Sequence, residues 1–198
     1  MAIKYIGDKL QFSYIKEEDL PSVCRMLEKE NVCKWLFFGP NTHETTREYF
    51  TPLIESVKKS LDAKEIPKNP VFTIKTKEEG HFVGQCALLQ IDYSPGAFLL
   101  GYQIDDICWH RSYGTEACEF LVYYAFFIAE GYRINGDCVS ENTGSWKVMQ
   151  KCGFKKEGCQ RNYWHYNDNY YDRALYGLLK EDLNEDMISY YKEKFSGV

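Results

Sequence analysis

The chain has 198 residues, of which 44% are hydrophobic and 27% charged, and its formal net charge is −5. A chain of this length and composition folds as a globular domain whose core needs no metal or disulfide, so we expect one domain over residues 1–198. The acidic balance argues against a sequence-blind nucleic-acid binder, whose affinity comes from neutralising phosphates, and suits a cationic partner such as an amine.

The eight cysteines form no C-x-x-C pair, and none has zinc-ligand spacing to a histidine, so we predict no metal site. The amino-terminal sequence MAIKYIGDKLQF lacks the apolar core of a secretion signal. The longest apolar run, residues 120–129, is too short to span a bilayer. The sequence therefore predicts a cytoplasmic protein with no membrane partner, whose cysteines mostly behave as small buried hydrophobes.

The amino-terminal half begins with a short alternating segment, residues 11–15, which predicts a strand. A helix is expected at residues 20–30, with Asp19 as its candidate cap, and a second at 42–61, where apolar residues recur at helical spacing. The polar stretch 62–70 contains two prolines and indicates a loop. A β-rich run then predicts three strands, at residues 71–76, 82–91 and 97–104.

The carboxyl-terminal half alternates helices and strands. A helix is expected at residues 115–130, with Gly131 as the left-handed residue that ends it, followed by a strand at 134–139. A short helix at 145–151 ends at Gly153 in the same way. The sequence YNDNY then predicts a turn between two hairpin strands, residues 154–165 and 171–179. The order of elements predicts an α/β (α+β) fold in which helices flank a mixed sheet.

The segment LLGYQIDDICWHRSYGTEACEFLVYYAF combines a strand, a loop and the start of a helix. A helix amino terminus offers unpaired N–H groups and the positive end of the helix dipole, and together these can bind a diphosphate. The loop lacks the glycine and lysine spacing of a P-loop and the three glycines of a dinucleotide site. Spacing alone fits an ordinary turn capped by Thr115 equally well. The residues offered by the loop are His110, Arg111, Ser112, Tyr113, Gly114 and Thr115.

Three stretches of the chain carry a family resemblance: GYQI from Gly101, WHRSYGTEA from Trp109, and NTGSWKVMQKCGFKKEG from Asn142. They resemble the motifs of the GNAT superfamily of acyl-CoA-dependent N-acetyltransferases, and most closely its RimJ/RimL type, the ribosomal-protein N-terminal acetyltransferases. The resemblance implies acetyl-CoA as co-substrate. It also implies a GNAT-like fold whose mixed central sheet splays between its fourth and fifth strands, here residues 97–104 and 134–139.

The resemblance also implies which residues hold the co-substrate. Ser112 departs from the family pattern, which usually has glycine there. A serine side chain can crowd a phosphate and would be strained at positive φ. The residues that the resemblance assigns to acetyl-CoA are Gln103, Ile104, Trp109, His110, Arg111, Ser112, Tyr113, Gly114, Thr115, Asn142 and Ser145.

Acetyl transfer to an amine needs a donor for the developing oxyanion, an acid for the leaving thiolate and a base for the amine. As the resemblance implies, a backbone N–H between Gln103 and Asp105 is the oxyanion candidate. Ser145 is expected nearest the thiolate, although it could simply cap its helix. Tyrosine is a better acid than serine, so the hairpin residues Tyr163 and Tyr166 remain alternatives. The base is open among water and five side chains, Asp105, Asp106, Glu141, Glu157 and His165.

The sequence thus predicts an acetyl-CoA-dependent N-acetyltransferase that joins acetyl-CoA and a primary amine in a ternary complex. The amine could belong to a protein N-terminus, a polyamine, an amino sugar or another small molecule. Its pocket is expected between the two amino-terminal helices and the last hairpin, near Trp35, Phe37 and Phe38. The alternative is a non-catalytic acyl-CoA sensor or partner-binding module on the same fold. Monomer and homodimer both remain open.

Overall fold

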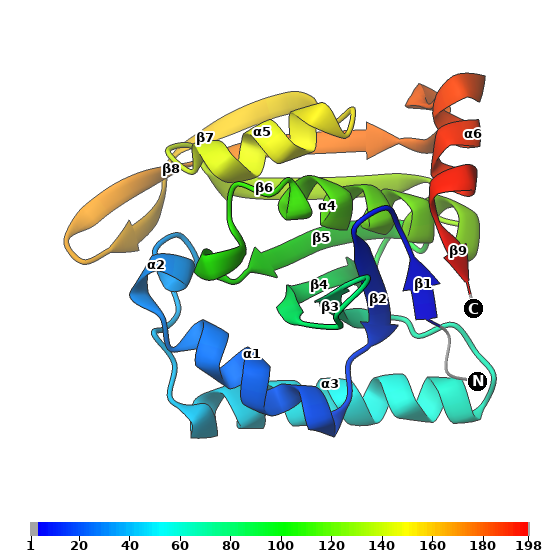
Figure 1. Ribbon diagram of the computed structural model, residues 1–198. Helices are drawn as coiled ribbons and strands as arrows, with labels where there is room; N and C mark the ends of the chain where they lie inside the picture. Colours follow the sequence, from blue (N-terminus) through cyan, green and yellow to red (C-terminus); the bar gives the residue numbers. More distant parts are fainter. Residues whose placement is uncertain (1–3, 198) are drawn as a thin grey trace.

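The computed structural model describes residues 4–197, which form one nine-stranded mixed sheet with helices on both faces (Figure 1). The strands lie in the order β7-β8-β6-β5-β4-β3-β2-β1-β9. The α/β architecture predicted from the sequence is therefore confirmed. The strands are β1 (Lys4–Ile6), β2 (Leu10–Tyr14), β3 (Val71–Thr76), β4 (Phe82–Gln90), β5 (Ala97–Ile104), β6 (Arg133–Val139), β7 (Lys155–Tyr166), β8 (Asn169–Leu179) and β9 (Ser196–Gly197).

The helices form two layers, one on each face of the sheet (Figure 1). The first layer contains α4 (Tyr113–Tyr123) and α5 (Thr143–Lys151), and α6 (Glu185–Lys194) packs against α4. The second layer, on the opposite face, contains α1 (Leu20–Leu27), α2 (Glu30–Cys33) and α3 (His43–Asp62). The sheet therefore has one side that faces α4 and α5 and another that faces α1, α2 and α3.

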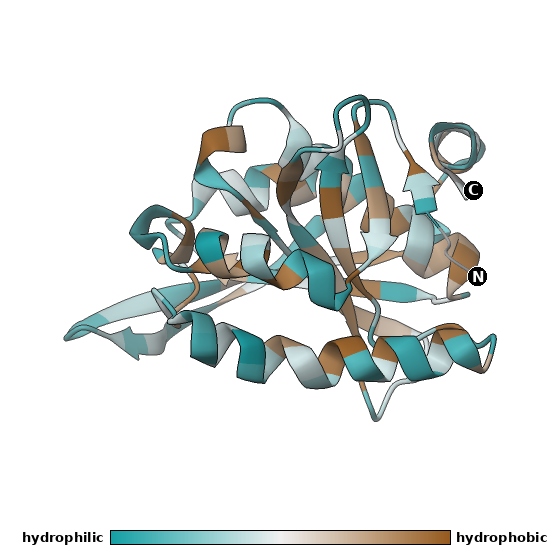
Figure 2. Ribbon diagram, turned by 60° about the horizontal axis from the view of Figure 1, so that its bottom comes forward, coloured by the Kyte–Doolittle hydropathy of each residue, from teal (hydrophilic) through white to brown (hydrophobic). Residues whose placement is uncertain are grey.

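The main core lies between the sheet and α4 and is unusually aromatic. The stacked rings of Phe12 and Phe120 have centroids 4.0 Å apart, and the hydroxyls of Tyr14 and Tyr124 lie 2.7 Å apart within the same cluster. A second apolar cluster fills the space under α1 and α3. Figure 2 shows the hydrophobic residues concentrated in the central strands and the helix faces toward them, whereas the projecting end of the β7–β8 hairpin is hydrophilic.

The neighbours β5 and β6 run parallel but pair only over their first three residues, Ala97–Leu99 with Arg133–Asn135. On its other edge β5 pairs with β4 along nearly its whole length, up to Ile104. Beyond Leu99 the two parallel strands separate, which opens the sheet. The splay expected between the fourth and fifth predicted strands is confirmed, and it falls between β5 and β6 because β1 precedes the first predicted strand.

The last hairpin closes on a two-residue turn, tighter than YNDNY suggested. Both Asn167 and Asp168 have positive φ, 49° and 57°. This is the conformation of a type I′ turn, which Asn and Asp tolerate better than most residues. The strands of the hairpin therefore extend to Tyr166 and from Asn169.

Three local predictions are wrong. Asp19 occupies the N-cap position of α1, but its side chain does not cap the helix: its carboxylate accepts a hydrogen bond from Lys16 N (3.1 Å) and pairs with Lys75 Nζ (2.9 Å). Gly131 is not the left-handed residue, because Glu130 adopts that conformation (φ 52°). Glycine is nonetheless required at 131, since a Cβ there would lie 2.7 Å from the ring of Phe98.

The third error concerns the long helix after the loop, predicted at residues 115–130. Helix α4 starts two residues earlier, at Tyr113, and changes at Tyr124–Ile128 into a π-helical turn. Residues 113–115 therefore belong to the first helical turn and not to a preceding loop.

The sequence also did not indicate four elements: β1, α2, α6 and β9.

Candidate active site

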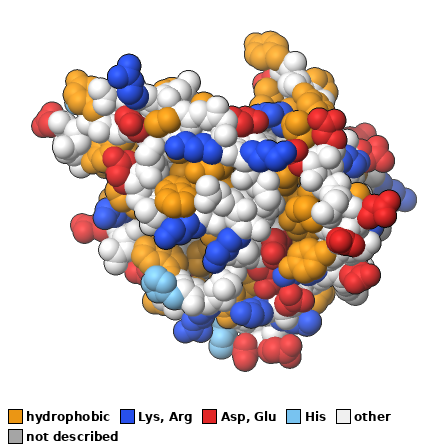
Figure 3. Space-filling view, turned by 90° about the horizontal axis from the view of Figure 1, so that it is seen from above, with side chains coloured by type: hydrophobic (Ala, Val, Ile, Leu, Met, Phe, Trp, Pro, Cys, Tyr) orange, Lys and Arg blue, Asp and Glu red, His pale blue; other side chains and the backbone are white. Residues whose placement is uncertain are grey.

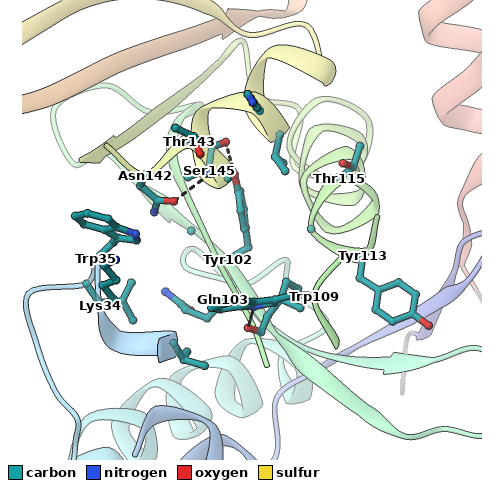
Figure 4. Close-up of a pocket in the computed structure, with 18 of the residues that line it drawn as sticks. Lys34, Trp35, Tyr102, Gln103, Trp109, Tyr113, Thr115, Asn142, Thr143 and Ser145 are labelled. Carbon is teal, nitrogen blue, oxygen red and sulfur yellow. Dashed lines mark hydrogen bonds between the residues drawn. The ribbon is translucent and has the colours of Figure 1, made fainter. Parts of the chain in front are cut away.

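A cavity of about 980 Å³ opens where β5 and β6 separate. Its walls are the first turn of α4, the end of β5, the first turn of α5 and, from the opposite layer, the segment around α2 (Figure 4). Three parts of the chain, within residues 31–36, 100–115 and 137–151, thus meet at the splay. The cavity is the natural place to look for the predicted chemistry.

The loop before α4 holds two non-glycine residues in the left-handed region, His110 (φ 61°) and Ser112 (φ 65°). The first backbone N–H to donate within the helix is that of Glu116, to the carbonyl of Ser112 at 3.1 Å. The amides of Tyr113, Gly114 and Thr115 are therefore free of helical partners. They form an anion-binding terminus at the cavity wall, and Ser112 is in the strained conformation that the sequence analysis anticipated.

The buried carboxylate of Glu116 fixes this terminus to the rest of the fold. Its oxygens accept hydrogen bonds from the backbone N–H groups of Lys9 and Leu10, each at 3.0 Å. Gly7 lies in the same turn, and a Cβ there would collide with the Glu116 carboxylate. Glu116 was not singled out from the sequence, because its partners lie more than 100 residues away.

The backbone of β5 presents some of its amides to the opening. The N–H of Asp105 donates to the carbonyl of Val83 at 2.9 Å, so it is occupied by β4. Because hydrogen bonding alternates along an antiparallel pair, the N–H groups of Tyr102 and Ile104 face the other way, toward the splay. Within the range predicted to hold the oxyanion donor, the amide of Ile104 is thus the one directed at the opening.

Side chains of β5 alternate between the two sides of the sheet. Tyr102 points toward α5, where its hydroxyl donates to the carbonyl of Ser145 (3.0 Å) and lies 3.4 Å from the Ser145 hydroxyl (Figure 4). Burial raises the pKa of Tyr102 well above its usual range, so it stays protonated at neutral pH. Sequence reasoning missed Tyr102, although it lies inside the GYQI motif.

Asn142, and not Ser145, caps α5. The Asn142 side-chain oxygen accepts a hydrogen bond from the backbone N–H of Ser145 at 3.3 Å. Ser145 occupies the third position of the helix, and its hydroxyl lines the cavity beside Tyr102. Ser145 is therefore an N-terminal helix residue and not the helix cap, and it also lines the cavity.

Asp105, a predicted catalytic base, lies in a partly buried ion cluster. Lys29 Nζ is 2.6 Å from Asp105 and 2.8 Å from Asp106. Burial lowers the pKa of Lys29, but its hydrogen bonds to the two carboxylates outweigh this effect and raise the pKa. The same hydrogen bond lowers the pKa of the partner carboxyl, Asp106. Asp105 is thus engaged in holding α2 against the end of β5.

Most of the predicted co-substrate residues meet at the cavity. Asp105 faces Lys29, Arg111 belongs to the loop but not to the lining, and Tyr163 is half-exposed with its ring 4.6 Å from the Arg173 guanidinium. Seven predicted co-substrate or catalytic residues do not line the cavity: Asp105, Asp106, Arg111, Glu157, Tyr163, His165 and Tyr166. The predicted co-substrate and catalytic residues that line it are Gln103, Ile104, Trp109, His110, Ser112, Tyr113, Gly114, Thr115, Glu141, Asn142 and Ser145.

Basic side chains border the cavity on the side of α4 and α5. Lys147 and Lys151 of α5 and His110 of the loop are part of its lining. Figure 3 looks onto this side and shows Lys and Arg side chains gathered on it. Together with the free amides of α4 they favour an anionic ligand. Among residues 4–197, no group of three or more His, Cys, Asp or Glu side chains could hold a metal ion.

The aromatic residues predicted near the acceptor join α2 to the last hairpin. Trp35 lines the cavity and makes an edge contact with Tyr171, with centroids 6.3 Å apart. The ring of Phe37 contacts Trp164, Tyr166 and Tyr171, whereas Phe38 is largely exposed. The described helices include none long and apolar enough to cross a membrane.

Comparison with known proteins agrees with this geometry. The acetyltransferase (GNAT) domain family matches residues 9–155, which is most of the chain. This chain belongs to the GNAT family. As the curated relatives of the family are named N-acetyltransferases, we describe it as a GNAT N-acetyltransferase. One of them is the uncharacterized N-acetyltransferase p20 of Bacillus licheniformis, 25% identical over 175 residues that cover 88% of this chain and 95% of p20.

Solved GNAT structures share the fold at low identity. Spermidine N-acetyltransferase from Vibrio cholerae, solved with CoA and spermine, has a TM-score of 0.73 and 17% identity, covering 87% of this chain and 96% of that one. Ribosomal-protein-S5-alanine acetyltransferase from Vibrio fischeri has a TM-score of 0.74 and 20% identity, covering 91% and 98%. These neighbours show the GNAT fold for this chain.

Proposed function

We propose that this GNAT N-acetyltransferase binds acetyl-CoA in the cavity at the splay and transfers its acetyl group directly to a primary amine in a ternary complex. The observation that carries the proposal is the meeting of two features at one cavity: the free amides that open α4 and the separation of β5 from β6. The first suits a diphosphate, and the second makes room for an extended arm between two strands.

In the proposed complex the α4 amides, with His110 nearby, hold the diphosphate. The pantetheine arm runs along the open edge of β5 toward Asn142. The thioester carbonyl then accepts a hydrogen bond from the N–H of Ile104, which stabilises the oxyanion that forms during attack. Because the two substrates are held together on opposite sides of the splay, much of the entropic barrier is removed.

The chemistry requires one bond to form and one to break. The neutral amine nitrogen attacks the thioester carbonyl carbon, the new C–N bond forms and the C–S bond breaks. The departing thiolate takes a proton, and the nitrogen loses one. We assign the proton donor to the Tyr102–Ser145 pair, because the two hydroxyls lie 3.4 Å apart and both residues line the cavity. Tyr163 is too far along the hairpin to line this cavity and has no part in the assignment.

The proposal is tested by following free thiol release from acetyl-CoA with a panel of amines: an N-terminally free tripeptide amide, spermidine and an aminoglycoside. Amine-dependent thiol release with an equal amount of acetylated product is expected. Binding of acetyl-CoA without thiol release for any amine would instead match a non-catalytic acyl-CoA sensor. Activity confined to the peptide would exclude the small-molecule acceptors.

The cellular location belongs to the same proposal. All eight cysteines are free and seven are buried, with only Cys159 exposed. Free and mostly buried thiols suit the reducing cytoplasm, where acetyl-CoA is available.

A further inference from the structure

Alternation along β6 separates the two sides of the cavity. A Cβ on Gly136 would collide with Met149 of α5, so Gly136 faces the α4–α5 layer. Its neighbour Asp137 must therefore face the opposite side of the sheet, the side of α2. The same alternation on β5 turns Tyr102 toward α5 and Gln103 toward Trp35 and Lys34, as Figure 4 shows. Asp137 thus lies on the side from which an acceptor would approach.

Asp137 is held in place by contacts that leave part of its carboxylate free. Its Oδ2 accepts a hydrogen bond from Arg173 Nε at 2.8 Å. The Arg173 guanidinium lies over the rings of Tyr163 and Trp164, at 4.6 and 5.8 Å from their centroids. The Asp137 side chain is only 18% exposed, yet it contributes to the cavity lining. Among residues 4–197, the polar contact of its carboxylate is the one that engages Oδ2, so Oδ1 is the atom available to a bound molecule.

Two carboxylates are found among the described residues that line the cavity, Asp137 and Glu141. Glu141 is exposed on the loop before Asn142, where solvent screens its charge. Asp137 is largely withdrawn from water, so a hydrogen bond to it is stronger and more directional. Electrostatics therefore favour Asp137 over Glu141 as the partner of an incoming amine.

We propose that Asp137 binds the acceptor amine, with Oδ1 of Asp137 accepting a hydrogen bond from the amine N–H. This inference rests on the proposed acetyl transfer. Arg173 has a specific role in this arrangement. A bare buried carboxylate would hold the acceptor as an ammonium ion, which cannot attack. Because Asp137 shares its negative charge with Arg173, its carboxylate binds a cation less strongly but remains a good hydrogen-bond acceptor. Tyr163 then acts as a positioning residue, since it supports Arg173 and does not itself touch the substrates.

The experiment compares Asp137→Asn with Glu141→Gln, a matched change of the other carboxylate. The acceptor is whichever of the tripeptide amide, spermidine or aminoglycoside gives the highest turnover with the unaltered protein. We expect Asp137→Asn to raise the KM for the amine about tenfold and to leave the KM for acetyl-CoA within about twofold. Glu141→Gln should change neither by more than about twofold. Thermal unfolding of both variants checks that the fold is kept.

A readout without turnover keeps this inference separate from the proposed function. The same amine is titrated calorimetrically into CoA-saturated protein, and Asp137→Asn should weaken its binding about tenfold. An unchanged amine affinity and KM in Asp137→Asn would overturn the role of Asp137 while leaving acetyl transfer intact. Equal losses in Asp137→Asn and Glu141→Gln would overturn it as well, because they would indicate only the general charge of the cavity. No thiol release by the unaltered protein would instead overturn the proposed function.

Discussion

A negative charge placed at the start of α4 tests the proposed diphosphate site directly. Gly114 is in the first turn of α4 and lines the cavity. A Cβ there would lie 3.7 Å from Val148 and 3.9 Å from Ile104, which are ordinary contacts, so the backbone can accept a side chain without rearrangement. Glutamate near a helix amino terminus is also compatible with the helix dipole. Gly114→Glu should therefore fold normally.

Its effect on acetyl-CoA can be worked from Coulomb's law. A carboxylate about 6 Å from one phosphate charge, at an effective dielectric constant of about 20, is repelled by about 3 kcal/mol. Screening at physiological salt reduces this to about 1–2 kcal/mol, which corresponds to a loss of affinity of about 5- to 30-fold. Because the repulsion is electrostatic, the loss should shrink as salt is raised.

The assay is calorimetric titration of CoA into the unaltered protein, Gly114→Glu and Gly114→Ala at two salt concentrations. Gly114→Ala adds the Cβ without the charge and should stay within about threefold of the unaltered protein. Equal affinity in all three proteins would refute the placement of the diphosphate at α4. An equal loss in both variants would show a steric effect, and the electrostatic reasoning would fail.

Three further predictions concern separate features of the site. Ser112→Gly should relieve the left-handed strain and raise the free energy of unfolding by up to about 1 kcal/mol, measured by urea denaturation; a loss of stability would contradict the strain. Ser145→Ala should lower kcat more than it changes the KM for acetyl-CoA, and Tyr102→Phe should do the same, whereas full activity in both would remove the pair from proton transfer. Lys29→Met should cost about 1–3 kcal/mol of stability, since it leaves the carboxylates of Asp105 and Asp106 without their cation. Because folding raises the pKa of Lys29, the stability difference between the unaltered protein and Lys29→Met should be largest below about pH 10.4, the pKa of an unfolded lysine. It should shrink as the pH rises from there through the folded pKa. A stability difference that stays constant in urea denaturation up to pH 11 would contradict this reasoning.

Strongly patterned elements could be read from the sequence. Helix α3 begins after Thr42, whose hydroxyl accepts a hydrogen bond from the N–H of Thr45, and it was expected to within about one residue. The element α2 has only four residues, too few for a periodic signal. Helix α6 did carry terminal signals, since Asn184 caps it, acidic residues follow and lysines lie in its last turn. These signals could have identified it.

The first turn of α4 was harder to place. The sequence put Thr115 at the cap, but the chain turns at Ser112, which takes the left-handed conformation without a side-chain hydrogen bond to the helix. Serine has no intrinsic preference for that conformation. The anchor that holds the turn is the Glu116 carboxylate, which accepts hydrogen bonds from the backbone N–H groups of Lys9 and Leu10, more than 100 residues away in sequence. A local pattern could not reveal it.

The roles of the acidic residues show why candidate lists from a sequence need the fold. Asp105 and Asp137 both lie on or directly after the strands that separate, and the sequence analysis named only Asp105 as a base candidate. In the structure, the cation that pairs with each carboxylate gives the two aspartates different roles. Lys29, 76 residues away from Asp105, binds that carboxylate and ties α2 to β5. Arg173, 36 residues beyond Asp137, holds that carboxylate by one oxygen at the cavity. The same side chain therefore serves as a tether at one strand end and as a candidate amine ligand at the other, because Asp137 lines the cavity whereas Asp105 faces Lys29 outside it.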